Sequence, residues 1–345
     1  MKEEFVAQLD RAAATLPGLP VTAALLASLS EQLKKGDPPW WSATFKAWEK
    51  RKFVAWSEAW GLFLTSIHYE ALSDAENPLV PYFPSCGGTG EADPSGALAE
   101  FLRDAPKSFY EHLRTGYRRA YVAARASLWL GPAMLFFARR NLPFYLAEAN
   151  AGAGLDLAAD LVAPQNGFDS ELVAARIGLD PQPQQLEDIS HRRWLTAAIM
   201  PDAALFISDL DKAIETVLKC QRKDAAFIQL AACGPEAAWR FIGKNIPADD
   251  KDVGLLLFNM GVTVRMSDAE YEAYRYGIAR MLSPWQDRAL WVEVENVRGE
   301  LYSTTFQLRA HRLLGGELRS HVMLSLDFGA QKTAFNAEES AKFLA

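Results

Sequence analysis

One short segment has the residue types and spacing of a nucleotide-binding turn. Residues 142–156 form an apolar run that ends in an acid, followed by a turn of small residues and a helix-like stretch. Glycine lets a ligand approach the backbone, and the N-terminus of a following helix offers unpaired N–H groups. Asn tolerates the left-handed backbone needed at the first glycine position, where it stands here. The candidate cofactor-binding residues are Glu148, Asn150, Gly152, Gly154 and Asp156.

The alternative for this segment is a Gly/Ala-rich turn that only permits close packing. Asp180, which ends the second apolar run, is the sixth candidate for cofactor binding because a carboxylate can accept both hydroxyls of a ribose. An Asx turn before Pro181 explains the same residue without a ligand.

Polar residues also end the fourth and fifth apolar runs, where ligands of doubly wound sheets bind. Asn259 and Glu295 are the candidate catalytic residues. Asn is not a base at neutral pH, so Asn259 would position a substrate, and Glu295 would meet a cationic amine. Ordinary polar strand ends are the alternative for both.

The elements that must position these residues divide the chain into two regions. Residues 1–140 have helical periodicity, with aromatic residues at three- and four-residue intervals between Trp41 and Ile67 that predict core packing. Residues 141–330 alternate short apolar runs with amphipathic helices, which predicts an α/β domain with a mainly parallel sheet. Residues 331–345 are a C-terminal tail.

The predicted strands and helices of the second region follow from these patterns. The five apolar runs are residues 144–148, 173–180, 225–232, 253–258 and 289–294. Helices are expected over residues 190–199, 209–220, 235–243 and 267–282, the last beginning with a capping-box pattern at Ser267. Two further strands, residues 301–309 and 318–328, flank Gly315–Gly316 and predict an antiparallel hairpin. A parallel core followed by such a hairpin is typical of S-adenosylmethionine-dependent methyltransferases, whereas dinucleotide dehydrogenases usually continue with parallel strands.

Composition and charge narrow the function classes. The net charge of -7, from 43 acidic and 36 basic residues without long single-sign blocks, argues against a general nucleic-acid-binding surface. Three separated cysteines and five histidines without metal-ligand spacing predict no metal site and a reducing cytoplasm. Neither a secretory signal nor a membrane span is expected. His68 is interpreted as a packed or capping histidine.

Seven segments together resemble the domain-of-unknown-function family DUF2332. They are residues 67–69, 77–84, 148–156, 176–183, 192–195, 201–202 and 291–295. This bacterial family has no settled reaction, and the resemblance implies a helical N-terminal region followed by a Rossmann-type, methyltransferase-like domain. The sequence departs from the family pattern at residues 119–125, at Leu230–Ala231 and at Asn259–Met260, where polar residues are absent or replaced.

These observations lead to two principal hypotheses. The first is a cytoplasmic methyltransferase-like protein that binds S-adenosylmethionine and acts on a small molecule. The second is a degenerate, non-catalytic member that binds a nucleotide-like ligand or a protein partner, for which Asn150, Ala231 and Asn259 are the evidence. An NAD-dependent oxidoreductase is a weaker third option.

Overall fold

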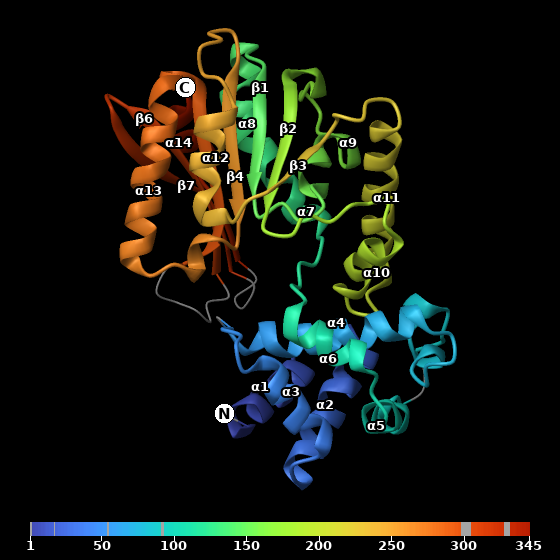
Figure 1. Cartoon of the computed structure of the whole chain (residues 1–345). Helices are drawn as coiled ribbons and strands as arrows, with labels where there is room; N and C mark the ends of the chain where they lie inside the picture. The colour runs from blue at the N-terminus through green and yellow to red at the C-terminus, as the bar shows by residue number, and fades with distance from the viewer. Residues whose placement is uncertain (1, 17, 54, 91–92, 298–304, 328–331) are drawn as a thin grey trace. The chain divides into compact units, whose positions relative to one another are not determined.

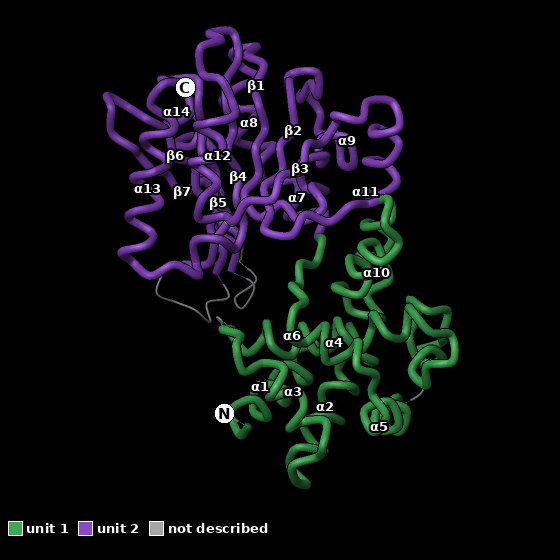
Figure 2. The backbone as a smooth tube through the Cα atoms, in the orientation of Figure 1, with its two compact units in different colours: residues 1–121, 187–211 green, residues 122–186, 212–345 purple. Residues whose placement is uncertain are grey.

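The computed structural model describes residues 2–16, 18–53, 55–90, 93–297, 305–327 and 332–345 (Figure 1). The chain divides into two compact units, coloured separately in Figure 2. Unit 1 comprises residues 1–121 and 187–211, and unit 2 comprises residues 122–186 and 212–345. The sequence analysis placed the boundary at residue 140, whereas the first part of unit 1 ends at residue 121. Residues 187–211, which come later in the chain, also belong to unit 1.

Residues 122–140 belong to unit 2 because their aromatic side chains pack beside its first strand. The ring of Phe137 stacks on Phe144 with centroids 4.3 Å apart. The indole N–H of Trp129 donates to the carbonyl of Asp156 at 2.9 Å. This segment contains the helices α7 (Ala123–Ala126) and α8 (Leu130–Phe136). Periodicity alone marks it as helical but does not say which unit it covers.

Unit 1 is helical. Its N-terminal part contains α1 (Lys2–Ala14), α2 (Pro20–Lys35), α3 (Pro39–Trp48), α4 (Trp56–Ser73), α5 (Ser95–Arg103) and α6 (Lys107–Thr115). The regularly spaced aromatic residues between Trp41 and Ile67 are divided between two helices, α3 and α4. Trp41, Trp48 and Phe63 are buried in the core of this unit, and Phe5 stacks on Trp41 at 5.3 Å.

The segment from residue 187 to 211 is tied to the N-terminal helices by hydrogen bonds. Its helix α10 (Ile189–Ala197) is capped at the N-terminus by Asp188, whose carboxylate accepts the Ser190 N–H. The carboxylate of Asp202 caps α2 by accepting the N–H groups of Val21 and Thr22 at 2.8 and 3.1 Å. The next helix, α11 (Ala204–Gln221), contains the division between the units.

Unit 2 is built on one eight-stranded sheet in the order β3-β2-β1-β4-β5-β6-β7-β8. The strands are β1 (Phe144–Ala149), β2 (Val173–Asp180), β3 (Gln229–Ala232), β4 (Gly254–Met260), β5 (Ala289–Asn296), β6 (Thr305–Leu314), β7 (Glu317–Asp327) and β8 (Lys332–Phe335). The first five pair in parallel, and β5 to β8 pair antiparallel. The predicted mixed α/β fold, with a helical N-terminal region and antiparallel C-terminal strands, is confirmed. Residues 332–344 of the predicted tail form β8 and the helix α14 (Ala337–Leu344).

Local sequence signals account for the elements beside this sheet. Ser267 and Glu270 form the predicted capping box at the start of α13 (Asp268–Leu282), which lies in front of the sheet with α12 (Ala238–Asn245) in Figure 1. Gly315 and Gly316 both have positive φ, at +60° and +85°. A two-residue turn with this backbone matches the twist of the hairpin that it joins.

A glycine in β2 allows the turn after β1 to pack closely. A Cβ on Gly178 would lie 2.5 Å from Leu230 Cδ2 and 2.9 Å from Ala151 Cβ. Leu230 can rotate away, but Ala151 belongs to the turn backbone and has no rotamer to change.

We therefore expect Gly178→Ala to lower the free energy of unfolding by about 1–3 kcal/mol, the usual cost of overpacking. Gly131→Ala is the matched control, because a Cβ at Gly131 meets nothing within 4 Å and Ala favours the helix α8. Urea unfolding followed by circular dichroism measures both. Equal stability of Gly178→Ala and the unchanged protein would contradict the close approach.

Candidate functional site

The turn after β1 has the backbone that the sequence predicts. Asn150, Gly152 and Gly154 all have left-handed φ values, of +70°, +59° and +73°. Glycine adopts this region freely, and Asn is one of the few other residues that tolerates it. Asn150 therefore replaces a glycine without altering the course of the turn.

Hydrogen bonds within unit 2 hold this turn closed. Four of its N–H groups donate to protein oxygens: Asn150 and Ala151 to the Leu179 carbonyl, Gly152 to the Asp180 carboxylate, and Gly154 to the Ala151 carbonyl. The chain then continues as a 3-10 turn, Leu155–Ala158, and the four-residue helix α9 (Ala159–Val162). This differs from the expected helix N-terminus with unpaired N–H groups. A ligand would thus meet the surface of the turn, and these four N–H groups are not available for an anion.

Asp180 joins the carboxyl ends of β1 and β2. Its Oδ2 accepts the Gly152 N–H and its Oδ1 accepts the Gln182 N–H, both at 2.8 Å, and the residue is 4% exposed. The second contact is the Asx turn that the sequence offered as an alternative to ribose binding. An ionised carboxylate has about four acceptor positions, so these two bonds leave acceptor capacity on each oxygen.

A buried ion pair fixes the segment after the turn to β2. The Arg176 guanidinium donates to the Asp160 carboxylate at 2.5 Å and to the Leu157 carbonyl at 3.0 Å. A planar guanidinium suits such a paired contact, because its donors are held in a rigid fork. Neither Asp160 nor the pairing of Arg176 was predicted, since nothing local in the sequence links β2 to α9.

The remaining candidates near the turn are buried. Glu148 has no exposed surface and Asp156 is 8% exposed. A Cβ on Gly154 would lie 2.9 Å from Ile228 Cγ2 and 3.2 Å from Leu230 Cδ2. Gly154 therefore permits close packing against the chain around β3, as the alternative for this turn proposed.

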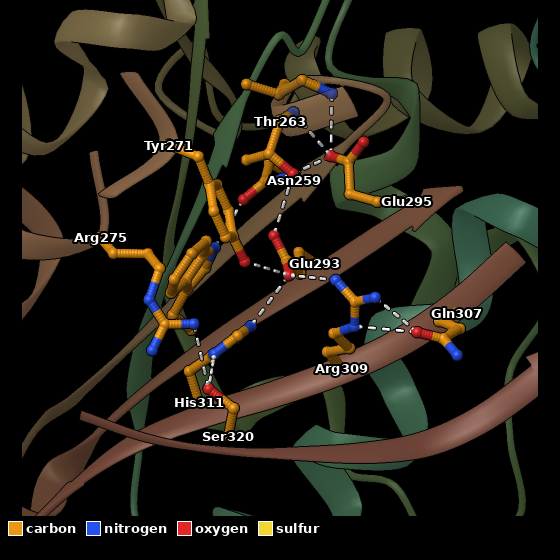
Figure 3. Close-up of polar contacts among 12 residues, drawn as sticks. Asn259, Thr263, Tyr271, Arg275, Glu293, Glu295, Gln307, Arg309, His311 and Ser320 are labelled. Carbon is orange, nitrogen blue, oxygen red and sulfur yellow. Dashed lines mark hydrogen bonds and ion pairs between the residues drawn. The ribbon is translucent and has the colours of Figure 1, made fainter. Parts of the chain in front are cut away.

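A second polar group lies at the carboxyl ends of β4 and β5 (Figure 3). Glu295 is fully buried and its carboxylate accepts four N–H groups. The donors are the Asn259 side chain at 2.9 Å and the backbone of Val262, Thr263 and Val264 at 2.9, 3.1 and 3.2 Å. Glu295 therefore holds the loop after β4 in place. The sequence analysis expected this carboxylate to meet a substrate amine, but in the structure it has no exposed surface.

Asn259 is fixed at both ends of its side-chain amide. Its nitrogen donates to Glu295, and its oxygen accepts the Trp291 indole N–H at 2.6 Å. Asn259 is fully buried. The expected contact with a substrate would require this pair of bonds to be given up, whereas in the structure the Asn259 amide is bonded to Glu295 and Trp291.

Glu293, two residues before Glu295, anchors the network shown in Figure 3. Its carboxylate accepts hydroxyl groups from Thr263 and Tyr271 and lies 3.3 Å from the guanidinium of Arg309 and 3.2 Å from Nε2 of His311. The His311 ring stacks on Trp291 at 4.0 Å.

The two neighbouring carboxylates have opposite pKa shifts. Burial opposes ionisation of Glu293, but His311, Arg309 and the Tyr271 hydroxyl hold its pKa at about 2. For Glu295, burial and the nearby Glu293 charge raise the pKa to about 7, against the effect of the backbone N–H donors. Glu293 is thus the persistent anion and Glu295 the titratable member.

The predicted site residues form two groups on neighbouring strands. Asn150, Gly152 and Asp180 are joined by backbone and side-chain bonds, and Asn259 is bonded to Glu295. Ala149 and Asn259 are register partners on β1 and β4, which places the groups on adjacent strands. The sequence analysis did not predict the contacts of Tyr271, Arg309 and His311 with Glu293 on β5, because tertiary packing alone brings these residues together. The nearest available signal was the Glu293–Glu295 spacing, which puts both acids on one face of a strand.

In the described part of the chain, no group of three or more His, Cys, Asp or Glu residues has the arrangement of a metal site. Among the same residues, no helix has the length and apolar character required to span a bilayer.

Comparison with known proteins identifies one family. A family model described as an uncharacterised protein conserved in bacteria, DUF2332, matches residues 6–167 and 162–331. No curated protein matches the chain.

The raised pKa of Glu295 predicts a pH-dependent stability. The Glu295 carboxyl has its ordinary pKa of 4.5 in the unfolded chain and a pKa of about 7 in the folded protein. The stability that it contributes is therefore full below pH 4.5 and is lost as the pH rises through 7. We expect Glu295→Gln to remove this loss. Relative to the unchanged protein, the variant gains about 3 kcal/mol in unfolding free energy between the two pH values.

Urea unfolding at several pH values between 4.5 and 8 measures this difference. Glu272→Gln is the control, because the Glu272 side chain is 74% exposed on α13, and its difference should stay flat. A flat difference for Glu295→Gln as well would show that Glu295 titrates normally in the folded protein.

Proposed function

The chain belongs to the bacterial family DUF2332, and we propose that it is a methyltransferase-like protein that binds S-adenosylmethionine and acts on a small molecule. The strand order supports this proposal. The parallel strands run β3-β2-β1-β4-β5, so the order reverses between β1 and β4. Ligands of open α/β sheets bind outside the carboxyl ends of the strands at such a reversal. The antiparallel strands that follow β5 favour a methyltransferase over a dehydrogenase.

The single observation that carries the proposal is the left-handed turn joined to Asp180. Gly152 has no side chain to obstruct a ligand, and its N–H orients the Asp180 carboxylate. The acceptor capacity left on that carboxylate suits the two hydroxyls of a ribose. Glu148 and Asp156 are buried, so in this proposal they would support the turn rather than contact the cofactor directly.

The chain's own residues would act by binding and positioning. The cofactor, when bound, supplies an electrophilic methyl group. Glu295, which accepts a hydrogen bond from Asn259, holds residues 262–264 beside the reversal point, and this loop would place the acceptor. Because neither side chain is free to remove a proton, rate enhancement would come from alignment rather than from general-base catalysis at these positions.

The second candidate is a non-catalytic protein that binds a nucleotide-like ligand or a protein partner. Two observations favour it over a working enzyme. Four N–H groups of the turn are already bonded within unit 2, and both ends of the Asn259 amide are bonded to Glu295 and Trp291. Ala231, at the carboxyl end of β3, adds no polar group.

Calorimetric titration with S-adenosylmethionine, S-adenosylhomocysteine and NAD in parallel tests the proposal. We expect micromolar binding of the two adenosyl ligands and about tenfold weaker binding by Asp180→Asn, because one charged acceptor is lost. Asp169→Asn is the matched control. Asp169 is exposed, and its carboxylate also accepts the N–H two residues ahead, away from the turn.

The outcomes separate the candidates. Absence of binding to both adenosyl ligands would overturn the methyltransferase proposal, and preferential binding of NAD would indicate an oxidoreductase. If Asp180→Asn and Asp169→Asn both bind the adenosyl ligands as tightly as the unchanged protein does, Asp180 does not bind the ribose. Circular dichroism of each variant establishes that its fold is intact.

A further inference from the structure

A serine and a histidine lie within hydrogen-bond distance in unit 1, which Figure 2 shows in green. His68 is on α4, and Ser85 is on the single turn η2 (Pro84–Cys86). The Ser85 hydroxyl oxygen lies 2.7 Å from Nε2 of His68. The two residues come from different elements, 17 positions apart.

The partners of His68 assign its tautomer. Nδ1 lies 3.2 Å from the carbonyl of Ala197 and 3.0 Å from that of Ile199. Carbonyl oxygens only accept, so Nδ1 carries the ring proton. Nε2 of the neutral ring is then an acceptor, and the Ser85 hydroxyl donates to it. A nucleophile, a base and a group that orients the base are the three parts of an activated serine.

The surroundings keep the imidazole neutral. His68 is 1% exposed, and its ring meets Phe83 edge-on with centroids 5.7 Å apart. Burial lowers the pKa of His68 to about 4, although Ala197, Ile199 and Asp202 oppose this shift. Ser85, by contrast, is only partly buried, and its N–H donates to the Pro201 carbonyl at 3.1 Å. The base is thus enclosed and the nucleophile is held near the surface.

We infer that Ser85 is an acyl-accepting nucleophile with His68 as its general base, a site independent of the proposed cofactor turn. As the Ser85 oxygen bonds to the acyl carbon, its proton moves to Nε2 of His68. The bond to the leaving group breaks, and that proton passes to the leaving group. Water then attacks the acyl-serine while His68 removes one of its protons. The bond between the acyl carbon and the Ser85 oxygen breaks, His68 returns that proton to Ser85, and the free acid departs.

The backbone beside Ser85 restricts the class of substrate. The N–H groups of Cys86 and Gly88 donate to the Phe83 carbonyl, and that of Gly87 donates to the Pro84 carbonyl. These N–H groups are committed and do not form an oxyanion hole, which normally supplies the largest share of acyl-transfer catalysis. The substrates are therefore activated acyl donors, such as thioesters and aryl esters, rather than amides.

Incubation of the full chain with p-nitrophenyl acetate, followed by peptide mass spectrometry, tests this inference. We expect acetylation at Ser85, none at that position in Ser85→Ala, and at least about a hundredfold slower acetylation in His68→Gln, the usual effect of losing a general base. Ser95 serves as the internal control, because its hydroxyl donates to the Asp93 carboxylate instead of a histidine. In Cys86→Ala, unchanged labelling is expected if acylation of Ser85 is direct.

The inference is overturned if Ser85 is not acetylated, or if it is acetylated no faster than Ser95. An unchanged rate in a folded His68→Gln variant would also overturn it. If His68→Gln does not fold, the test uses the unchanged protein with and without urea. We expect the faster acetylation of Ser85 over Ser95 to disappear when urea unfolds the chain. If Ser85 is still acetylated faster in urea, His68 is not its general base.

Discussion

The burial of carboxylates at the carboxyl ends of parallel strands is the constraint on which the rest of unit 2 depends. Removing an ionised carboxylate from water costs several kcal/mol unless donors replace the lost hydration. Asp180 receives backbone N–H groups from the turns around it, and Glu295 receives those of residues 262–264. Glu293 is compensated instead by side chains from α13 and β6. The loops at this edge of the sheet therefore have the conformations that satisfy these acids.

This constraint accounts for how the candidate site is organised. The turn after β1 and the loop after β4 follow adjacent strands. Asp180 on β2 holds the turn after β1, and Glu295 on β5 holds the loop after β4. Such loops are preorganised, which favours binding, but the same bonds occupy the groups that could act on a substrate. The methyltransferase proposal relies on the acceptor capacity that Asp180 retains, whereas the non-catalytic alternative relies on how fully Asn259 is bonded.

Unit 1 also buries a polar side chain that needs hydrogen-bond partners, but this side chain, the imidazole of His68, is neutral. His68 is buried with its ring edge-on to Phe83, and the carbonyls of Ala197 and Ile199 accept its ring proton. These carbonyls belong to residues 187–211, which return to the N-terminal helices after the first two strands of the sheet. The environment of His68 thus depends on a segment that follows it by about 130 residues, as the separations of 129 and 131 positions show.

Signals that act over a few residues were sufficient to predict much of the fold. The apolar runs located β1, β2, β4 and β5, the Ser267–Glu270 pair marked the start of α13, and Gly315–Gly316 marked the hairpin. The left-handed backbone at Asn150 was also predictable, because it is a local preference. Tertiary structure alone decided that residues 187–211 join unit 1, that Asp160 pairs with Arg176, that Glu295 is enclosed by N–H donors, and that Ser85 meets His68. The physical reason is that backbone preference and periodicity are properties of neighbouring residues, whereas the partner of a buried polar group is whichever distant residue the folded chain brings within about 3 Å of it.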